Sequence, residues 1–222
     1  MDSHRLLFIV RELLHGIGVT LEVTLFAALL ALILSFVLAF LRLARWRAVR
    51  FIASAWIEFF RGTSALVQLF YLFFILPLLG VNISPLLTAV IGLGVNFSAF
   101  GAEIVRSALV NVSRDQYDAA RALDFSTVAA FRRIIFPQSL PLMLPPLGNL
   151  LIELLKSTSL VSLITLSDLT FAGSTLITSI GQQTLIWSMV LLCYFLLTWP
   201  LSRLVRHYEN RHAHYLSAGS PQ

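Results

Sequence analysis

Charged and amide side chains inside the apolar segments are the residues of this chain best placed to do chemistry. In the segment 140–160, Asn149, Glu153 and Lys156 lie at i, i+4 and i+7 and therefore share one helical face. Ionised groups are costly at bilayer depth, so they usually face protein or water. A carboxylate and an ammonium on one face can complement the two charges of a zwitterion, or they can neutralise each other. Asn96, on the preceding apolar segment, is a further candidate.

Two other pairs of opposite charge are spaced three residues apart. One is Glu58 with Arg61, and the other is Glu103 with Arg106. Side chains at i and i+3 are neighbours on a helix, so each pair can form an ion pair. We predict that both pairs are structural, neutralising charge and fixing helix packing, and a functional role is the alternative.

The composition indicates a chain that needs lipid as its solvent. Of the 222 residues, 58% are hydrophobic and 12% are charged, and the mean hydropathy is +0.85. Soluble domains carry about 25% charged residues. The single cysteine, Cys193, excludes a disulfide framework, and the five histidines lie outside the apolar runs, which argues against an intramembrane metal site. We predict one integral membrane domain, residues 1–222.

Five apolar runs are long enough to cross a bilayer as helices, since one crossing takes about 20 residues. They are residues 17–41, 56–79, 85–105, 140–160 and 184–205. A further run, 164–180, is interrupted by polar residues and can form a short re-entrant sixth segment. The sequence therefore predicts an all-α polytopic membrane protein with five transmembrane helices. Residues 1–16 are expected to form a separate helix lying on the outer membrane interface.

The arginines indicate how these spans are oriented. They gather in the segments 42–50, 106–133 and 203–211, which five crossings place on one side of the membrane. The opposite side receives Arg5 and Arg11. By the positive-inside rule, the N-terminus is predicted to lie outside and the tail 206–222 to be cytoplasmic. The net charge of +5 then reflects topology, and no nucleic-acid partner is inferred.

The inner connection 111–137 is long enough to carry structure of its own. Ser113 followed by Gln116 fits a capping box and predicts a first helix. Asp124 can end that helix, because Asp tolerates the left-handed conformation. Ser126 can cap a second short helix.

Two further features of this loop concern its end and its surface. Pro137 is expected to stop the second helix, because proline lacks the amide hydrogen that a helix interior uses. The first helix carries Ala119, Ala120 and Ala122, whose small side chains let another surface approach the backbone closely. This favours docking over a solvated hairpin.

Several ordered motifs carry a resemblance to a known family. Residues 118–126 read Asp-Ala-Ala-Arg-Ala-Leu-Asp-Phe-Ser and precede a proline at the next span. The flanking stretches are Glu-Phe-Phe-Arg-Gly-Thr at 58–63, Leu-Pro-Pro-Leu-Gly-Asn at 144–149 and Leu-Lys-Ser-Thr-Ser-Leu at 155–160. Together they resemble the permease subunits of bacterial ABC importers for polar amino acids, the histidine, glutamine, arginine and opine permeases. Two positions depart from the family pattern, because Asp118 replaces its usual Glu and Asp124 its usual Gly.

The resemblance implies the type I ABC importer permease fold in a bacterial inner membrane. It implies three partners: a second identical or homologous permease subunit, an external solute-binding protein and a cytoplasmic ABC ATPase dimer. It also places the face of residues 149–156 near the solute path. The residues implied to couple to the ATPase are Asp118, Ala119, Ala120, Arg121, Asp124 and Phe125.

The chain carries no nucleotide-binding motif. A Walker A loop needs Gly-Lys followed by Ser or Thr, and the only lysine, Lys156, follows Leu155. We expect no catalytic residue, cofactor or metal on this chain, with ATP and Mg²⁺ on the partner ATPase. The alternative function is a self-sufficient ion-coupled carrier or channel, in which the intramembrane charges form a relay.

Overall fold

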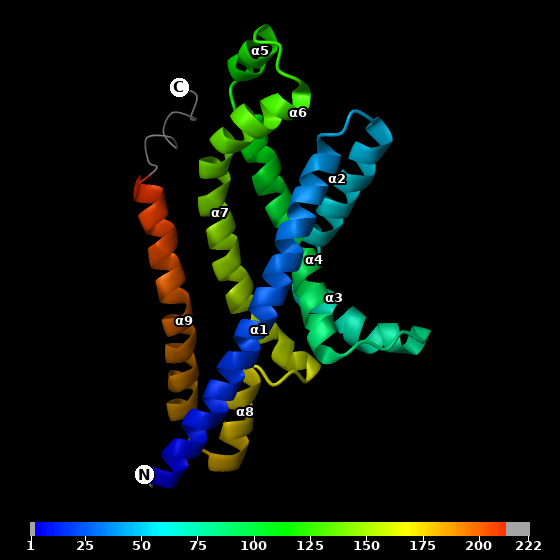
Figure 1. The fold of residues 1–222 in the computed structure, drawn as a ribbon. Helices are drawn as coiled ribbons and strands as arrows, with labels where there is room; N and C mark the ends of the chain where they lie inside the picture. The colour runs from blue at the N-terminus through cyan, green and yellow to red at the C-terminus, as the bar shows by residue number, and fades with distance from the viewer. Residues whose placement is uncertain (1–2, 212–222) are drawn as a thin grey trace.

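The computed structural model describes residues 3–211, and every regular element in that range is helical (Figure 1). The long helices are α1 (Ser3–Arg42), α2 (Arg47–Gly62), α4 (Pro85–Val110), α7 (Phe136–Ser157) and α9 (Gln183–Arg211). Shorter α-helices are α3 (Ala65–Phe70), α5 (Arg114–Ala122), α6 (Thr127–Ala130) and α8 (Leu169–Ile180). Two π-helical turns, η1 (Tyr71–Ile75) and η3 (Phe131–Ile135), and two 3₁₀ segments, η2 (Leu76–Leu79) and η4 (Thr158–Ile164), continue them.

The predicted spans are present, but the second is broken. Within the described range, four continuous helices are long and apolar enough to cross a membrane: Leu7–Arg42, Pro85–Val110, Thr127–Ile164 and Gln183–Arg211. The run 56–79 is not one straight helix, because α2 and the segment Ala65–Leu79 meet at an angle of 100°. The two helices amount to the fifth predicted span only when they are counted together. The run 164–180 contains α8, an apolar helix too short to cross.

The expected separate helix at residues 1–16 is wrong. The chain is helical without a break from Ser3 to Arg42, and Ile9 and Leu13, one turn apart, are buried against α8 and α9, so the first part of α1 packs on the bundle. The predicted tail 206–222 is also corrected in part. Residues 206–211 are the last turns of α9, and residues 212–222 lie outside the described range.

The three arginine-rich segments lie at the same end of the bundle, as predicted. Figure 1 shows the start of α2, the α5–α6 hairpin and the end of α9 together at one end, with the start of α1 and α8 at the other. The most extensive helix pairing is between α1 and α4. A core of apolar side chains from α1, α3, α4, α7 and η4 holds the bundle together.

Two side-chain amides hold the sharp bend between α2 and α3. The last carbonyls of a helix have no partner within it. Here the Phe60 carbonyl accepts hydrogen bonds from Asn96 Nδ2 at 3.0 Å and from Gln68 Nε2 at 3.3 Å. Asn96 also donates to Gln68 Oε1 at 3.2 Å, and Gln68 donates to Thr63 Oγ1 at 2.6 Å. Asn96 on α4 thereby fixes the direction in which the arm α3–η1–η2 leaves the bundle.

A buried carboxylate holds the start of α8. Asp168 is fully buried and caps the helix, with Oδ1 accepting from the Phe171 amide at 3.0 Å and Oδ2 from the Thr170 amide at 3.2 Å. The Tyr194 hydroxyl of α9 also donates to Asp168, at 3.3 Å. Because these groups bond the carboxylate from two helices, α8 is fixed against α9.

Glycine permits the closest crossing of α1 and α4, and this gives a stability prediction. A Cβ at residue 101 would lie 2.1 Å from Ser35 Oγ, which donates to the Ser98 carbonyl at 3.2 Å. At Gly18, a Cβ would meet nothing within 4 Å. Gly101→Leu should therefore destabilise the fold by about 1–3 kcal/mol through overpacking, while Gly18→Leu should not. Thermal unfolding of the two variants in detergent measures this, and equal midpoints would contradict the close crossing.

Candidate functional site

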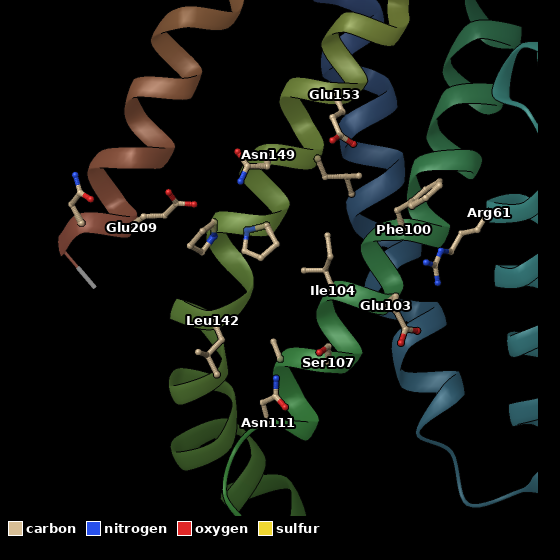
Figure 2. Close-up of a pocket in the computed structure, with 15 residues that line it drawn as sticks. Arg61, Phe100, Glu103, Ile104, Ser107, Asn111, Leu142, Asn149, Glu153 and Glu209 are labelled. Atoms are coloured by element: carbon tan, nitrogen blue, oxygen red, sulfur yellow. The ribbon is translucent and has the colours of Figure 1, made fainter. Parts of the chain in front are cut away.

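A cavity of about 1100 Å³ opens between α4 and α7, bounded also by α2 and the end of α9. Its charged residues are Arg61, Glu103, Glu153 and Glu209, and its amides are Asn111, Asn149 and Asn210. Figure 2 shows Asn149 and Glu153 on α7, the residues from Phe100 to Asn111 on α4, and Glu209 at the end of α9. Pro145 and Pro146 line it as well. The cavity therefore combines both signs of charge with amide groups.

The structure brings part of the predicted α7 face to this cavity. Asn149 and Glu153 are exposed and line it, one helical turn apart. Lys156 is exposed too but is not among the lining residues. The carboxylate and ammonium of this face therefore do not face one cavity, and the cavity's cation is on another helix.

That cation is Arg61, and the predicted Glu58–Arg61 pair is wrong. No ion pair joins these two side chains in the part of the chain that the structure describes. The Arg61 guanidinium carbon instead lies 5.4 Å from the centroid of the Phe100 ring. This is the geometry of a cation–π contact, which α4 offers across the helix interface. Arg61 thus lines the cavity against the Phe100 ring, with the Glu103 carboxylate as an electrostatic neighbour.

Asn96 does not contact the cavity. It is 4% exposed, and its amide is used in the bend between α2 and α3. Its predicted position on a solute path is wrong in this structure. The partner that decides this, Gln68, is 28 residues away in sequence, so spacing alone could not identify it.

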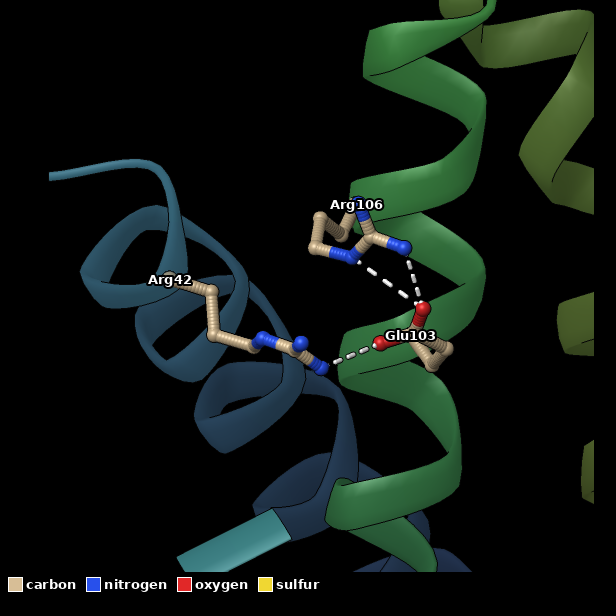
Figure 3. A network of polar contacts seen from close by, with 3 residues as sticks. All are labelled: Arg42, Glu103 and Arg106. Atoms are coloured by element: carbon tan, nitrogen blue, oxygen red, sulfur yellow. Dashed lines mark hydrogen bonds and ion pairs between the residues drawn. The ribbon is translucent and has the colours of Figure 1, made fainter. Parts of the chain in front are cut away.

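The predicted Glu103–Arg106 pair is confirmed and contains a third member. Glu103 Oε1 accepts from Arg106 Nε at 3.1 Å and forms an ion pair with Arg106 NH2, while Oε2 accepts from Arg42 NH1 at 2.8 Å (Figure 3). The three side chains are only 24–29% exposed. Arg42 ends α1, so this carboxylate ties α1 to α4 beside the cavity.

The connection 111–137 forms the two expected helices, but the first does not begin, and the second does not end, in the way the sequence predicts. Ser113 precedes α5 but makes no side-chain cap, so the predicted capping box does not form. Ser126 caps α6 by accepting from the Ala129 amide at 3.3 Å, as predicted. Pro137 does not stop the second helix: α6, η3, α7 and the 3₁₀ segment η4 form one helical stretch from Thr127 to Ile164. The π-helical turn η3 directly before the proline changes the local bonding register, which lets the helix continue.

Asp124 adopts the left-handed conformation that its position requires. Its φ is 53°, and the Asp124 amide donates to the Arg121 carbonyl while the Phe125 amide donates to the Ala120 carbonyl, both at 3.0 Å. These two bonds define a Schellman motif, which usually has glycine at this place. Asp124 thus ends α5 as the sequence indicated.

One surface of α5 is open for contact with another molecule. Asp118, Ala119 and Arg121 are exposed, and Ala120 is buried against the chain itself. Two large apolar side chains that the sequence reading missed are also exposed: Leu123, directly after α5, at 70%, and Val128, on α6, at 75%. Exposed apolar side chains that lie together commonly mark a contact surface.

The hairpin is attached to the bundle through Tyr117. Its hydroxyl donates to the Leu109 carbonyl at 3.3 Å, near the end of α4. Partial burial raises the pKa of the Tyr117 hydroxyl. Gln116 also bonds Gln138 at 3.2 Å. α5 is therefore held to both α4 and α7.

Comparison with known proteins agrees with this architecture. Residues 31–214 match the family model described as the binding-protein-dependent transport system inner membrane component. The chain belongs to this family. It is a multi-pass permease of the ABC transporter type, located in the inner membrane.

Relatives and a solved structure support the assignment. A probable amino-acid ABC transporter permease of Sinorhizobium fredii is 48% identical over 73% of this chain and 71% of its own. The glutamine transport system permease of Escherichia coli is 36% identical over 72% and 74%. The crystal structure of an amino acid ABC transporter with histidines superposes with a TM-score of 0.88 at 30% identity, over 95% of this chain and 99% of that chain. The permease therefore has the predicted type I importer fold.

The Schellman motif leads to a prediction about residue 124. Asp124→Val should destabilise the turn by about 1–2 kcal/mol, because a β-branched residue is strained at positive φ. Asp124→Gly keeps the turn. Hydrogen exchange of the backbone amides of residues 124 and 125 should accelerate about 5–30-fold in the valine variant and not in the glycine variant. Equal exchange in both variants would contradict the positive φ.

The three-residue ion cluster leads to a prediction about Glu103. Glu103→Gln leaves Arg42 and Arg106 without a counter-charge and should lower stability by about 1–2 kcal/mol, less than for a fully buried pair because the side chains stay partly exposed. Glu22→Gln, an exposed position on α1, is the control and should change stability by less than about 0.5 kcal/mol. Unfolding in detergent compares them, and an unchanged midpoint for Glu103→Gln would show that the cluster adds nothing.

Proposed function

We propose that the permease is one transmembrane subunit of an ATP-driven importer for a polar or zwitterionic amino acid or a related solute. With a second identical or homologous permease it would enclose the translocation path, and an external binding protein would deliver the solute. The supporting relatives are amino-acid permeases, one of them a glutamine system. The N-terminus would lie outside and the C-terminus in the cytoplasm, as the shared end of the arginine-rich segments favours.

The composition of the cavity is the observation on which this proposal depends. Glu153 supplies a carboxylate that can bind an ammonium group, and Arg61 supplies a guanidinium that can bind a carboxylate. Asn149 adds donors and an acceptor beside Glu153. An amino acid carries the matching pair of charges. Lys156 lies outside the cavity, so we assign the cationic role to Arg61.

The exposed surface of α5 would be the contact through which ATP hydrolysis drives transport. We infer that a cytoplasmic ATPase dimer, which holds ATP and Mg²⁺, receives Asp118, Ala119, Arg121 and Leu123, with Asp124 and Phe125 shaping the turn. The helix that follows runs unbroken from Thr127 to Ile164 and carries Glu153. A displacement of α5 would reach the wall of the cavity through α6 and the Gln116–Gln138 hydrogen bond, which join α5 to this helix. Alternation between inward and outward states follows from a shift in this equilibrium.

Uptake by the assembled complex in proteoliposomes tests the function. Glu153→Gln should reduce ATP-driven uptake about 10-fold, corresponding to the loss of one charged hydrogen bond of about 1.4 kcal/mol. Lys156→Met, on the same helix but outside the cavity, is the matched control and should transport normally. Both variants should still bind the ATPase. Equal uptake by the two variants would remove Glu153 from the path.

Two controls separate this function from the alternative. Uptake should stop when the ATPase is omitted and when residues 118–124 are deleted. Uptake that persists without ATPase and follows an ion gradient would instead establish an ion-coupled carrier.

A further inference from the structure

Helix α2 carries a row of polar side chains that no ion pair or hydrogen bond explains. Arg47, Arg50, Ser54, Glu58 and Arg61 follow one another at intervals of three or four residues and lie on one helical face. We call this face the polar stripe. In the part of the chain that the structure describes, none of these five side chains forms an ion pair or a hydrogen bond with protein.

The other faces of α2 are apolar. Ala53 and Ile57 are buried against the bundle, where Ile57 packs with side chains of α1 and α4. Ile52 and Phe59 are exposed on a third face, and Phe59 lines a separate apolar groove of about 560 Å³. Lipid or apolar protein can cover this third face. The polar stripe is therefore a distinct surface and not part of a generally polar helix.

Counted with the segment Ala65–Leu79 as one span, α2 carries the polar stripe into the membrane. The span in α1 ends at Arg42, so α2 begins near a membrane interface at Arg47. With a rise of about 1.5 Å per residue, Glu58 lies about 16 Å and Arg61 about 21 Å farther along the helix axis. An ionised side chain facing lipid at such depth costs about 2.5–3.5 kcal/mol. The deeper half of the stripe must consequently face water or protein.

The stripe is continuous with the cavity at its deep end. Arg61 is its last member and lines the cavity, where it contacts Phe100. Its first members lie at the interface where α2 begins. One polar surface thus connects the cavity with the membrane surface at the end that also carries α5.

We infer that the polar stripe is one wall of a water-filled exit route through which solute passes from the cavity to the inner face of the membrane. The inference rests on the proposed function, which supplies the direction of transport. Three guanidinium groups and one carboxylate give this wall a net positive charge, so it favours solutes that carry a carboxylate. Glu58 and Arg61 then line the route that the solute takes and do not form a structural ion pair.

Cysteine accessibility tests this inference in the assembled complex. In a Cys193→Ser background, Ser54→Cys and Glu58→Cys are compared with Ile52→Cys and Phe59→Cys, which lie at similar depth on the apolar face. A charged, membrane-impermeant methanethiosulfonate should modify the two stripe positions at least about 10-fold faster. Labelling with N-ethylmaleimide after denaturation measures the amount of each variant.

The outcomes separate this inference from the proposed function. If the stripe positions react no faster than the apolar controls, protein or lipid covers the stripe and the inference is overturned. ATP-driven uptake is measured for the Cys193→Ser parent, prepared in the same way as the variants. Normal uptake together with an unreactive stripe would reject the exit route and leave the importer function standing.

Discussion

The cost of charge in a low-dielectric membrane decides where this permease can keep its ionised side chains. The charge of Glu103 is stabilised by protein, because Arg42 and Arg106 bind its two carboxylate oxygens. Glu153 is the opposite case, since it lines the same cavity as Glu103 but has no ion-pair partner among the described residues. The same physical rule thus distinguishes a structural cluster from a polar surface that needs water.

Mechanical connection between the loop and the cavity depends on an uninterrupted helix. A proline at position 137 would ordinarily end the helix that begins at Thr127. The π-helical turn at Phe131–Ile135 accommodates it, so the helix continues past Glu153 to Ile164. α6 at one end and the cavity wall in the middle therefore belong to one continuous helix, and the Gln116–Gln138 hydrogen bond holds α5 to it.

The bend after α2 has a comparable role on the other side of the cavity. Without the amides of Asn96 and Gln68, the Phe60 carbonyl would be left without a partner in an apolar setting. Their hydrogen bonds permit α2 to end at Gly62, just after Arg61 has been placed beside Phe100. One buried amide thereby positions a charged residue that it does not contact.

Local patterns in the sequence determined the elements. Apolar run lengths located four spans and the region of the fifth, and the arginine segments placed two connections and the end of α9 at one end of the bundle. The left-handed turn at Asp124 and the cap at Ser126 were also predictable, because they involve neighbours in the chain. Such features need only propensity, periodicity and hydropathy.

Contacts between distant segments were decided only by the tertiary structure. The partner of Glu103 that sequence reasoning missed, Arg42, is 61 residues away, and Asn96 bonds a carbonyl 36 residues away. Spacing of three residues made Glu58 and Arg61 able to pair, but the Phe100 ring on α4 competes for the guanidinium. Helical spacing states which side chains share a face. Which of those faces meets a cavity depends on how the helices pack, and that information is not local.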